Sequence, residues 1–559
     1  MTEVRLDGES LTPEDVERVA RDDAPVTVTD DARERVRAAR ERVDAVVESG
    51  DAVYGVNTGF GELVDERIPA EEIETLQTNL VRSHAAGAGR ELTREEVRAM
   101  MVGRVNALVK GYSGVREVVV DHLATMLNEG VHPVVNSRGS LGASGDLAPL
   151  AHLALVLVGE GEARVERRST DGASEEESDR RADGERLDGD AALATADLEP
   201  LTLQAKEGLA LINGTQLTVG LAALAVRDAE RAIRAADVAG ALTTEVTMST
   251  TASCDRAIAD VRPHAGHAAS ARNVKRLTAD SEIVESHRNC DRVQDAYSIR
   301  CLPQVHGAVR DAVAHLRNAV ETELNSATDN PLIFPADAVD ERASGTGDAA
   351  VLSGGNFHGD PLALPLDYLT NAVTELAAIA ERRVDRMLNP NVQEPHLPPF
   401  LTERPGLRSG YMLAQYTAAA LVNENRATGR PSMDNTPVSG NQEDHVSMSA
   451  QSAFDARSAV ENALTVVGVE LLCAAQAAEF VDREALAAAD ATGSADHHGE
   501  DDDLSHGVGT GAAYDAVREV VPPLVEDRPI HEDIATAATL VRSGLLEARV
   551  EDDLDESLE

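Results

Sequence analysis

Four long stretches rich in alanine, leucine and valine constrain the fold of this chain more than any other feature of its sequence. They cover about residues 206–240, 303–327, 361–388 and 443–487 and contain few residues that break helices. Long helices with small side chains favour packing side by side in a bundle over short helices that cover a sheet. Strands and helices do not alternate as they do in a doubly wound fold. We therefore predict a mainly α protein, built as a long-helix bundle with a smaller, α-rich N-terminal domain.

The N-terminal part contains several shorter helical patterns. Residues 31–49 form an Arg/Glu-rich helical pattern, Thr93 begins a Thr-Arg-Glu-Glu capping sequence, and a third helix is predicted over about residues 115–129. We place the N-terminal domain in residues 1–205 and the long-helix bundle, with a C-terminal helical part, in residues 206–559.

Three segments interrupt the helical patterns. Residues 162–184 are dominated by acidic side chains and predict a solvated insertion, and residues 335–355 are typical of a Gly/Ala/Asp loop. Residues 490–511 contain the sequence DHHGEDDD and predict a flexible acidic loop. The histidines of this last segment could bind a metal ion, but a flexible loop is the better interpretation.

The composition argues against two classes of partner. The 559 residues include 98 Asp and Glu but only 51 Lys and Arg, which gives a formal net charge of −47. Nucleic acids and anionic membranes require a basic surface, so we expect neither as a partner. Strong acidity, three lysines and 2% aromatic residues are typical of a halophilic protein that stays soluble in high salt. The N-terminus lacks a signal-peptide pattern, and we predict a cytoplasmic location.

The stretch with the most unusual chemical potential is GSLGASGDLAPL at residues 139–150. On its own it predicts a Gly/Ser loop in which Asp146 caps the following apolar helix. Because Gly145 has no Cβ, its nitrogen can approach the Ala143 carbonyl closely. Cyclisation with loss of water, and loss of the Ser144 hydroxyl as a second water, would leave a five-membered ring with an exocyclic methylene. That group is an electrophile of a kind that no side chain provides, and a helix N-terminus beside it would stabilise developing negative charge.

This stretch resembles the signature of the aromatic amino acid ammonia-lyases, whose cofactor 4-methylidene-imidazol-5-one (MIO) forms autocatalytically from Ala-Ser-Gly. Six further stretches match the same family in the same order: VYGVNTGFG at 53–61, KEGLALINGTQ at 206–216, QDAYSIRCLPQVHG at 294–307, NSATDNP at 325–331, SGGNFHG at 353–359 and NQEDHVSM at 441–448. The resemblance implies a carbon–nitrogen lyase in which residues 143–145 form the MIO ring, with no metal or nucleotide. It also implies a homotetramer whose active sites combine residues of several subunits.

The resemblance assigns roles to three residues of the N-terminal and central motifs. Tyr54 would be the catalytic base that removes the β-proton of the substrate, in a glycine-rich loop expected to act as a lid that excludes water. Asn213 interrupts an apolar helical pattern and matches a position beside the ring carbonyl, where a buried amide would find a partner. Phe357 matches a residue that lines the pocket near the ring.

The QDAYSIR motif supplies three more candidates. Tyr297 matches a catalytic position beside the ring, and Arg300, one helical turn later, matches the residue that pairs with the substrate carboxylate. Gln294 lies three residues before Tyr297 and is expected on the same helical face. Without the resemblance, the three residues would indicate an ordinary amphipathic helix.

Two positions bear on the substrate. His84 lies where histidine-specific members of the family have a histidine, and Glu443 matches a carboxylate expected to meet the substrate imidazole. A phenyl ring would leave these polar groups desolvated and unpaired. Because tyrosine-selective relatives also have a histidine at the position of His84, Glu443 discriminates better between the possible substrates. We therefore predict deamination of L-histidine to trans-urocanate and ammonia, the first step of histidine degradation.

Three alternatives remain open from the sequence. The nearest is a tyrosine or phenylalanine ammonia-lyase, or an aminomutase, that uses the same ring. A second is a helical assembly protein that has lost catalysis, against which the intact Ala-Ser-Gly and Tyr54 argue. A third is an acidic metal-storage or salt-adaptive protein, which rests only on composition and on the segment 490–511.

Overall fold

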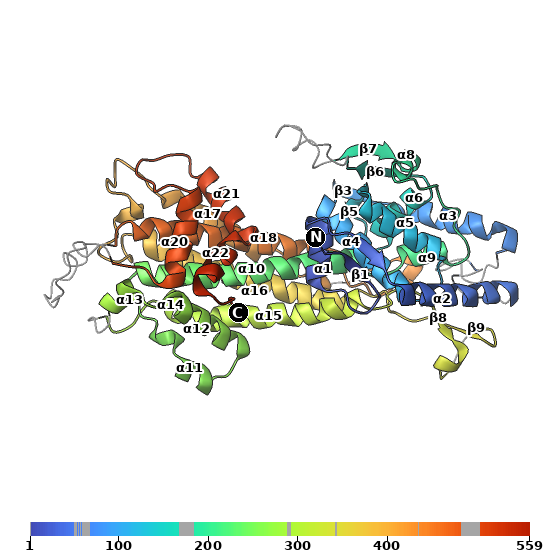
Figure 1. The fold of residues 1–559 in the computed structure, drawn as a ribbon, viewed down its shortest axis with the longest axis horizontal. Helices are drawn as coiled ribbons and strands as arrows, with labels where there is room; N and C mark the ends of the chain where they lie inside the picture. Colours follow the sequence, from blue (N-terminus) through green and yellow to red (C-terminus); the bar gives the residue numbers. More distant parts are fainter. Residues whose placement is uncertain are drawn as a thin grey trace. The chain divides into compact units, whose positions relative to one another are not determined.

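The computed structural model describes residues 2–49, 53, 55, 58, 68–166, 184–287, 292–340, 344–433, 435–481 and 504–559. Within them the chain is mainly helical, and its strands form small sheets of two or three strands (Figure 1), which confirms the predicted fold class. Contacts divide the chain into two compact units. The first consists of Met1–Arg227, Leu316–Asp367 and Arg430–Phe454, and the second of Asp228–His315, Tyr368–Gly429 and Asp455–Glu559. The predicted division near residue 205 assumes two continuous domains and stays a prediction.

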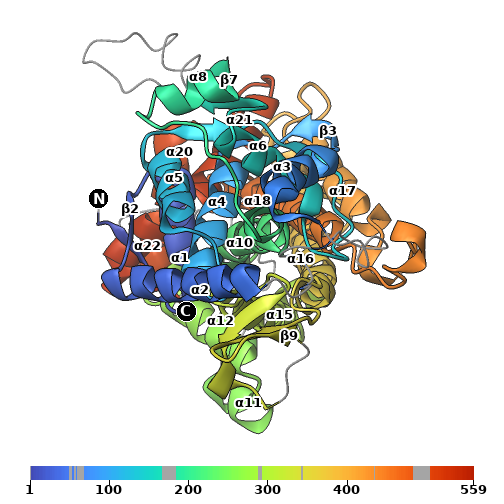
Figure 2. The same ribbon diagram turned by 90° about the vertical axis from the view of Figure 1, so that its right-hand side faces the viewer.

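The first unit combines short helices with small sheets. Its helices are α1 (Pro13–Arg21), α2 (Asp30–Ser49), α3 (Ile73–His84), α4 (Arg94–Val109), α5 (Glu117–Asn128), α6 (Leu147–Leu157), α8 (Gly189–Ala194) and α9 (Glu207–Ile212). Helices α3, α6 and α9 contact one another, and α4 packs against α1 and α5 (Figure 2).

The sheets of the first unit are short and mostly antiparallel. Strand β1 (Val4–Leu6) pairs in parallel with β2 (Val26–Val28), and β3 (Ala88–Glu91) pairs with β5 (Asn136–Arg138). The two three-stranded sheets have the orders β4–β6–β7 and β8–β10–β9. Their strands are β4 (Val131–Pro133), β6 (Glu162–Val165), β7 (Glu185–Asp188), β8 (Leu332–Pro335), β9 (Ser344–Gly345) and β10 (Ala349–Leu352).

The predicted N-terminal helices are present close to their expected bounds. The Thr93 side chain accepts a hydrogen bond from the Glu96 backbone, and the Glu96 carboxylate accepts one from the Thr93 backbone at 2.8 Å. This reciprocal cap satisfies two backbone N–H groups at the start of α4, as the Thr-Arg-Glu-Glu pattern predicts.

Two segments predicted as loops contain strands. The predicted insertion begins with β6, which pairs with both β4 and β7. The predicted Gly/Ala/Asp loop contains β9 and β10, and Ala349 and Val351 of β10 lie in a buried cluster with Val43 and Val46 of α2. Alanine and glycine have low strand propensity, so burial against α2 decides the conformation here and the local sequence does not.

The acidic segment near residue 500 is only partly described. Residues 482–503 lie outside the described residues, but helix α20 (Val508–Val520) already begins inside the predicted flexible loop. The buried Glu245 carboxylate accepts a hydrogen bond from the Gly507 backbone at 2.7 Å and pairs with His506 Nδ1, also at 2.7 Å. These contacts within the second unit hold the end of the segment in place, so the prediction is wrong for its last residues.

Four long helices have their two ends in different units: α10 (Gln216–Val246), α15 (Leu302–Leu324), α16 (Asp360–Leu388) and α18 (Ser449–Ala478). Helices α15 and α16 match the predicted stretches 303–327 and 361–388 closely, and α18 lies inside the longer stretch predicted over 443–487. The stretch expected over residues 206–240 is instead divided, because the chain leaves the helical conformation at Asn213 and Gly214 and separates α9 from α10.

The second unit joins all four long helices through buried charges. Arg383 of α16 donates to both oxygens of Glu470 of α18, at 2.5 and 2.8 Å, and Thr243 of α10 donates to the same carboxylate at 2.9 Å. His306 of α15 lies between Arg383 and Asp237 of α10. The pKa of His306 is lowered by burial, and the guanidinium can only donate, so Nε2 accepts from Arg383 and the proton resides on Nδ1, which donates to Asp237 at 2.7 Å.

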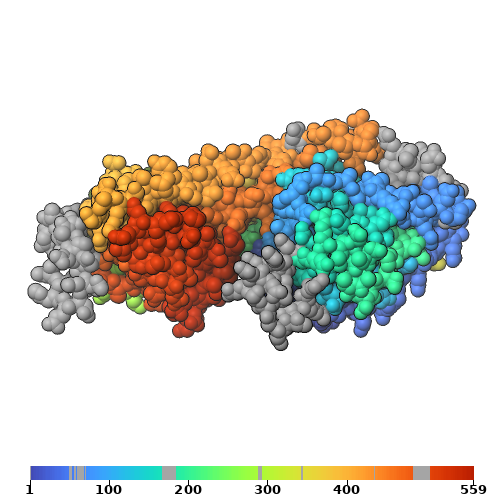
Figure 3. All heavy atoms as spheres, turned by 90° about the horizontal axis from the view of Figure 1, so that it is seen from above, coloured from blue at the N-terminus to red at the C-terminus, as the bar shows by residue number. Residues whose placement is uncertain are grey.

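The shorter helices of the second unit are α11 (Arg256–Val261), α12 (Ala265–Leu277), α13 (Glu282–Ser286), α14 (Tyr297–Arg300), α17 (Met412–Ala427), α20, α21 (His531–Arg542) and α22 (Leu545–Leu554). Helices α20, α21 and α22 contact one another and form the compact red group in Figure 3. Among the described residues, α18 is the one helix long and apolar enough to cross a membrane, and 78% of its 18-residue apolar stretch is buried inside the protein.

Replacing Glu470 should destabilise the bundle strongly. In Glu470→Ala the Arg383 guanidinium stays buried without its carboxylate, which costs about 3–5 kcal/mol of unfolding free energy. Glu461→Ala on the same helix is the matched control, because its pair with Arg542 is exposed and is worth at most about 1 kcal/mol. Urea unfolding followed by circular dichroism measures both variants, and equal losses would contradict the structural role of the buried pair.

Candidate active site

The Ala-Ser-Gly tripeptide lies between β5 and α6, against the break between α9 and α10. Gly145 has φ +77° and forms a backbone bridge with Gly214. A Cβ at Gly145 would lie 2.1 Å from the Gly214 carbonyl oxygen, so the two backbones touch and only glycine is accommodated. The Asp146 backbone N–H donates to the same carbonyl at 2.6 Å. Helices α6 and α10 therefore both begin beside the tripeptide, and each N-terminus contributes a partial positive charge there.

Asp146 caps a helix other than the one expected. It occupies the N-cap position of α6, but its side chain makes no cap hydrogen bond there. Its carboxylate accepts hydrogen bonds from Thr218 N of α10 at 2.8 Å and from Ser140 Oγ at 2.7 Å. Asp146 is fully buried, and burial raises the pKa of this carboxyl while these hydrogen bonds oppose the shift. The residue thus joins the tripeptide loop to the start of α10.

Two distant segments hold the loop from the other side. The Ser447 hydroxyl donates to the Gly142 carbonyl at 2.9 Å, and the Met448 backbone donates to the Leu141 carbonyl at 2.8 Å. The Gly359 backbone also donates to the Gly142 carbonyl, at 3.1 Å. Residues of the SGGNFHG and NQEDHVSM motifs therefore support the tripeptide directly.

Ser144 contacts two of the predicted site residues. Its hydroxyl donates to Oε1 of Glu443 at 2.8 Å, and its carbonyl accepts a hydrogen bond from Nδ2 of Asn213 at 2.9 Å. Asn213 is buried, and its Oδ1 has no hydrogen-bond partner among the residues that the structure describes. The structure thus brings together Ser144, Asn213 and Glu443, which lie far apart in the sequence.

Arg104 places a positive charge behind this turn. The fully buried guanidinium donates to the Asn213 carbonyl at 2.8 Å and to the Ala210 carbonyl at 3.0 Å. Burial lowers the pKa of Arg104 to about 10, so the group remains charged at neutral pH. Together with the two helix N-termini it makes the environment of the tripeptide favourable for developing negative charge.

The residues around the tripeptide fit an MIO ring. The third ring position admits only glycine, and the hydroxyl that must leave already has a carboxylate partner. The Asn213 amide donates to the Ser144 carbonyl, the oxygen that would become the ring carbonyl. The backbone N–H groups around the loop are held in place by the first turns of α6 and α10. They are therefore already positioned to stabilise negative charge before the reaction begins.

The other predicted residues of the first unit lie as follows. His84 ends α3, and its Nδ1 lies 2.8 Å from the Leu80 carbonyl, so that nitrogen carries the proton and Nε2 is an acceptor. Phe357 is half-buried in the turn that precedes α16. Tyr54 lies outside the described residues.

The QDAYSIR residues belong to the second unit and form a cluster of their own. Tyr297 is 71% exposed, and the Arg300 guanidinium lies 4.6 Å from the centre of its ring. Gln294 precedes α14 and is not on the predicted helical face, yet its side-chain oxygen accepts a hydrogen bond from Arg300. The short helix begins only at Tyr297, and the contact comes from the extended residues before it.

Sequence reasoning assigned no site role to several residues that shape the site, namely Arg104, Asp146, Thr218 and Ser447. Asp146 and Ser447 lie inside the GSLGASGDLAPL and NQEDHVSM motifs, but a motif does not show which helix a carboxylate caps. Arg104 lies in the stretch 99–109 of α4, which is apolar apart from Arg104 and Asn106, and a charged residue in such a stretch is the one signal that could have indicated it.

Comparisons with known proteins identify the family of this chain. Residues 11–519 match the family model for aromatic amino acid lyases. The chain is 61% identical over 555 residues to a probable histidine ammonia-lyase from Halobacterium salinarum, with 99% of each chain covered. It is 47% identical over 549 residues to a histidine ammonia-lyase from Sorangium cellulosum, with 98% of each chain covered.

Solved structures of histidine ammonia-lyases and related enzymes have the same fold as this chain. The fold matches a histidine ammonia-lyase from Trypanosoma cruzi with a TM-score of 0.84 and 38% identity, over 99% of this chain and 96% of that one. It matches a tyrosine aminomutase from Streptomyces globisporus with a TM-score of 0.85 and 36% identity, over 100% of both chains. The chain therefore belongs to the aromatic amino acid lyase family, and it is a carbon–nitrogen lyase.

Replacing Gly145 should prevent formation of the ring. A methyl group in Gly145→Ala would clash with the Gly214 carbonyl and force the tripeptide out of its turn. We expect an intact mass equal to that of the unmodified chain, whereas the wild type should be lighter by two water molecules. Gly406→Ala is the control, because Gly406 also has a positive φ, +96°, but no atom within 4 Å of the added carbon. A Gly145→Ala protein that is also lighter by two water molecules would contradict the structural requirement for glycine at this position.

Proposed function

We propose that this enzyme deaminates L-histidine to trans-urocanate and ammonia, as its relatives' names indicate for them. The observation in this chain that carries the proposal is the contact of the Glu443 carboxylate with the Ser144 hydroxyl, at 2.8 Å. A carboxylate at the reacting centre is a partner for the N–H group of an imidazole, whereas a phenyl ring would leave it desolvated and unpaired. His84 Nε2, an acceptor on the same unit, is a second polar group suited to an imidazole.

We propose that residues 143–145 supply the MIO ring as an electrophile for the substrate, either for its amine or for its imidazole. The β-proton of histidine is weakly acidic, so a positioned base must remove it, and the family pattern gives this role to Tyr54. Glu443 binds and orients the imidazole, while Arg300 pairs with the substrate carboxylate. Asn213 holds the Ser144 carbonyl, and the N-termini of α6 and α10 with Arg104 stabilise negative charge that develops during the reaction.

We further propose a homotetramer with composite active sites. Tyr297 and the half-buried Arg300 form an aromatic–cation pair on the second unit, and an aromatic ring that is 71% exposed on a single chain is suited to burial at a subunit interface. A neighbouring subunit would then complete the site with residues that the family pattern places beside the ring. The net charge of −47 supports a soluble enzyme of a salt-rich cytoplasm without nucleic acid or membrane partners.

Ser144 should be indispensable for turnover. In Ser144→Ala no hydroxyl is available to leave, so we expect loss of nearly all urocanate formation, with unchanged circular dichroism and an unmodified intact mass. Urocanate absorbance, measured in high and low salt, gives the rate. Ser505→Ala, an exposed serine, is the control and should keep wild-type activity. An active Ser144→Ala enzyme would contradict the proposed chemistry.

Glu443 should govern selectivity for histidine. Glu443→Gln removes a charged hydrogen-bond partner of the imidazole, which lowers kcat/KM for L-histidine by about 10- to 100-fold. Its turnover of tyrosine and phenylalanine, the substrates of the alternative lyases, should not fall in parallel. The exposed Glu403→Gln serves as the control. Wild-type turnover of tyrosine or phenylalanine above that of histidine, or β-amino acid products, would favour the alternative lyase or aminomutase.

A further inference from the structure

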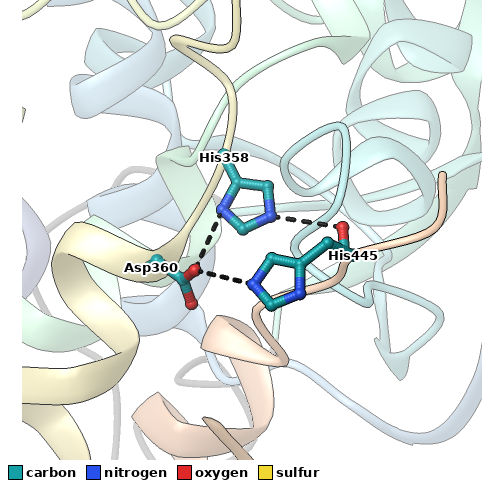
Figure 4. Close-up of side chains that lie close together, drawn as sticks. All are labelled: His358, Asp360 and His445. Carbon is teal, nitrogen blue, oxygen red and sulfur yellow. Dashed lines mark hydrogen bonds and ion pairs between the residues drawn. The ribbon is translucent and has the colours of Figure 1, made fainter. Parts of the chain in front are cut away.

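Three potential metal ligands converge beside the active-site loops. His358 and Asp360 flank Gly359 at the start of α16, and His445 follows 87 residues later in the chain. Figure 4 shows both imidazole rings directed toward the Asp360 carboxylate. Their spacing in the sequence does not indicate a metal site, which explains why none is predicted from it. All three residues belong to the first unit.

The distances suit a metal ion better than they suit ion pairs. Asp360 Oδ2 lies 3.5 Å from Nδ1 of His358 and 3.4 Å from Nε2 of His445. These separations exceed the usual range of a hydrogen bond. Two ligand atoms that each lie about 2.0–2.1 Å from a tetrahedral zinc ion are about 3.4 Å apart. All three ligand atoms lie within 4.8 Å of one another, so a small rotation of the exposed His445 would complete the group.

The second nitrogen of His358 supports this interpretation. Nε2 of His358 lies 3.3 Å from the His445 backbone carbonyl, which can only accept, so Nε2 carries the proton. With Nε2 donating to this carbonyl, Nδ1 is the nitrogen left to bind a metal ion, and it lies on the side of Asp360. Histidines that bind metals usually donate their other N–H group in this way, which fixes the tautomer and the orientation of the ring. The two rings are nearly parallel, at 6° and 5.5 Å between centres.

We propose that His358, Asp360 and His445 form a binding site for a divalent transition-metal ion such as Zn²⁺. Two imidazoles and one carboxylate favour zinc or a similar ion over Mg²⁺ and Ca²⁺, which prefer oxygen ligands. The side chains of His358 and Asp360 are 25% and 33% exposed, so an ion can reach them from solvent, and water can occupy the remaining coordination position.

The ion would connect two segments that support the tripeptide. His358 follows Phe357 and precedes Gly359, whose backbone donates to Gly142, and His445 lies two residues after Glu443. A metal bound to both histidines would thus fix the separation of the loops that carry Phe357 and Glu443. Its binding does not depend on the proposed lyase activity, because none of the three ligands belongs to the tripeptide.

Cobalt titration of the full-length protein tests the site. The titrations use Ser144→Ala as the background, so that failure of the lyase proposal cannot affect the result, and Co²⁺ replaces Zn²⁺ because its visible spectrum reports coordination by protein nitrogen. We expect one ion per chain with an intense low-symmetry spectrum and a higher unfolding temperature when metal is added. His358→Ala and His445→Ala should each weaken metal binding more than about tenfold. Replacing a residue that only hydrogen-bonds to a metal ligand already lowers metal affinity by at least that factor, and here the ligand itself is lost.

Two controls and a conservative variant complete the design. His497→Ala/His498→Ala removes two of the three histidines of the acidic segment, and His531→Ala removes an exposed histidine outside the cluster, so both should bind like the background protein. Asp360→Asn keeps the size of the side chain and should weaken binding even if an alanine variant fails to fold. Unchanged affinity in His358→Ala, His445→Ala and Asp360→Asn, or loss of binding only in the His497/His498 variant, would overturn the proposal.

Discussion

The contact between the backbones of Gly145 and Gly214 is the constraint on which the site depends. With the two chains bridged and no room for a Cβ, the loop before α6 and the break before α10 are held in one position. Two helix N-termini then meet at Ser144, and Asn213 is directed to its carbonyl. The close approach therefore produces both the strained turn that ring closure needs and the positive environment that an electrophile requires.

Buried charges reinforce this arrangement, each with compensating partners. Asp146 joins the tripeptide loop to α10, and Arg104 binds the carbonyls at the end of α9. In the second unit, Arg383, Glu470 and His306 connect the long helices with directional contacts that apolar packing does not provide. Each of these groups would be costly to bury alone, so its partners must be placed correctly for the fold to form, and this favours one arrangement of the helices.

The mainly α class and most helix bounds could be predicted because they depend on local patterns. Thr93 caps its helix as its sequence predicts, and three of the four long helices follow runs of apolar residues with few breakers. The predictions failed where contacts with residues distant in the sequence decide the local conformation. The strand at residues 349–352 exists because α2 covers it, and the end of the acidic segment is ordered because Glu245 binds its backbone.

For the site, the motifs indicated Ala143, Ser144, Gly145, Asn213 and Glu443, and the structure places Ser144, Asn213 and Glu443 in contact. The sequence by itself determined the family, the position of the Ala-Ser-Gly tripeptide and the helical class, because motifs and periodicity are properties of short segments. Only the tertiary structure decided which helix Asp146 caps, where Gln294 lies, and that His358, Asp360 and His445 converge. These are relations between residues far apart in the chain, and they exist only once the folded backbone brings the segments together.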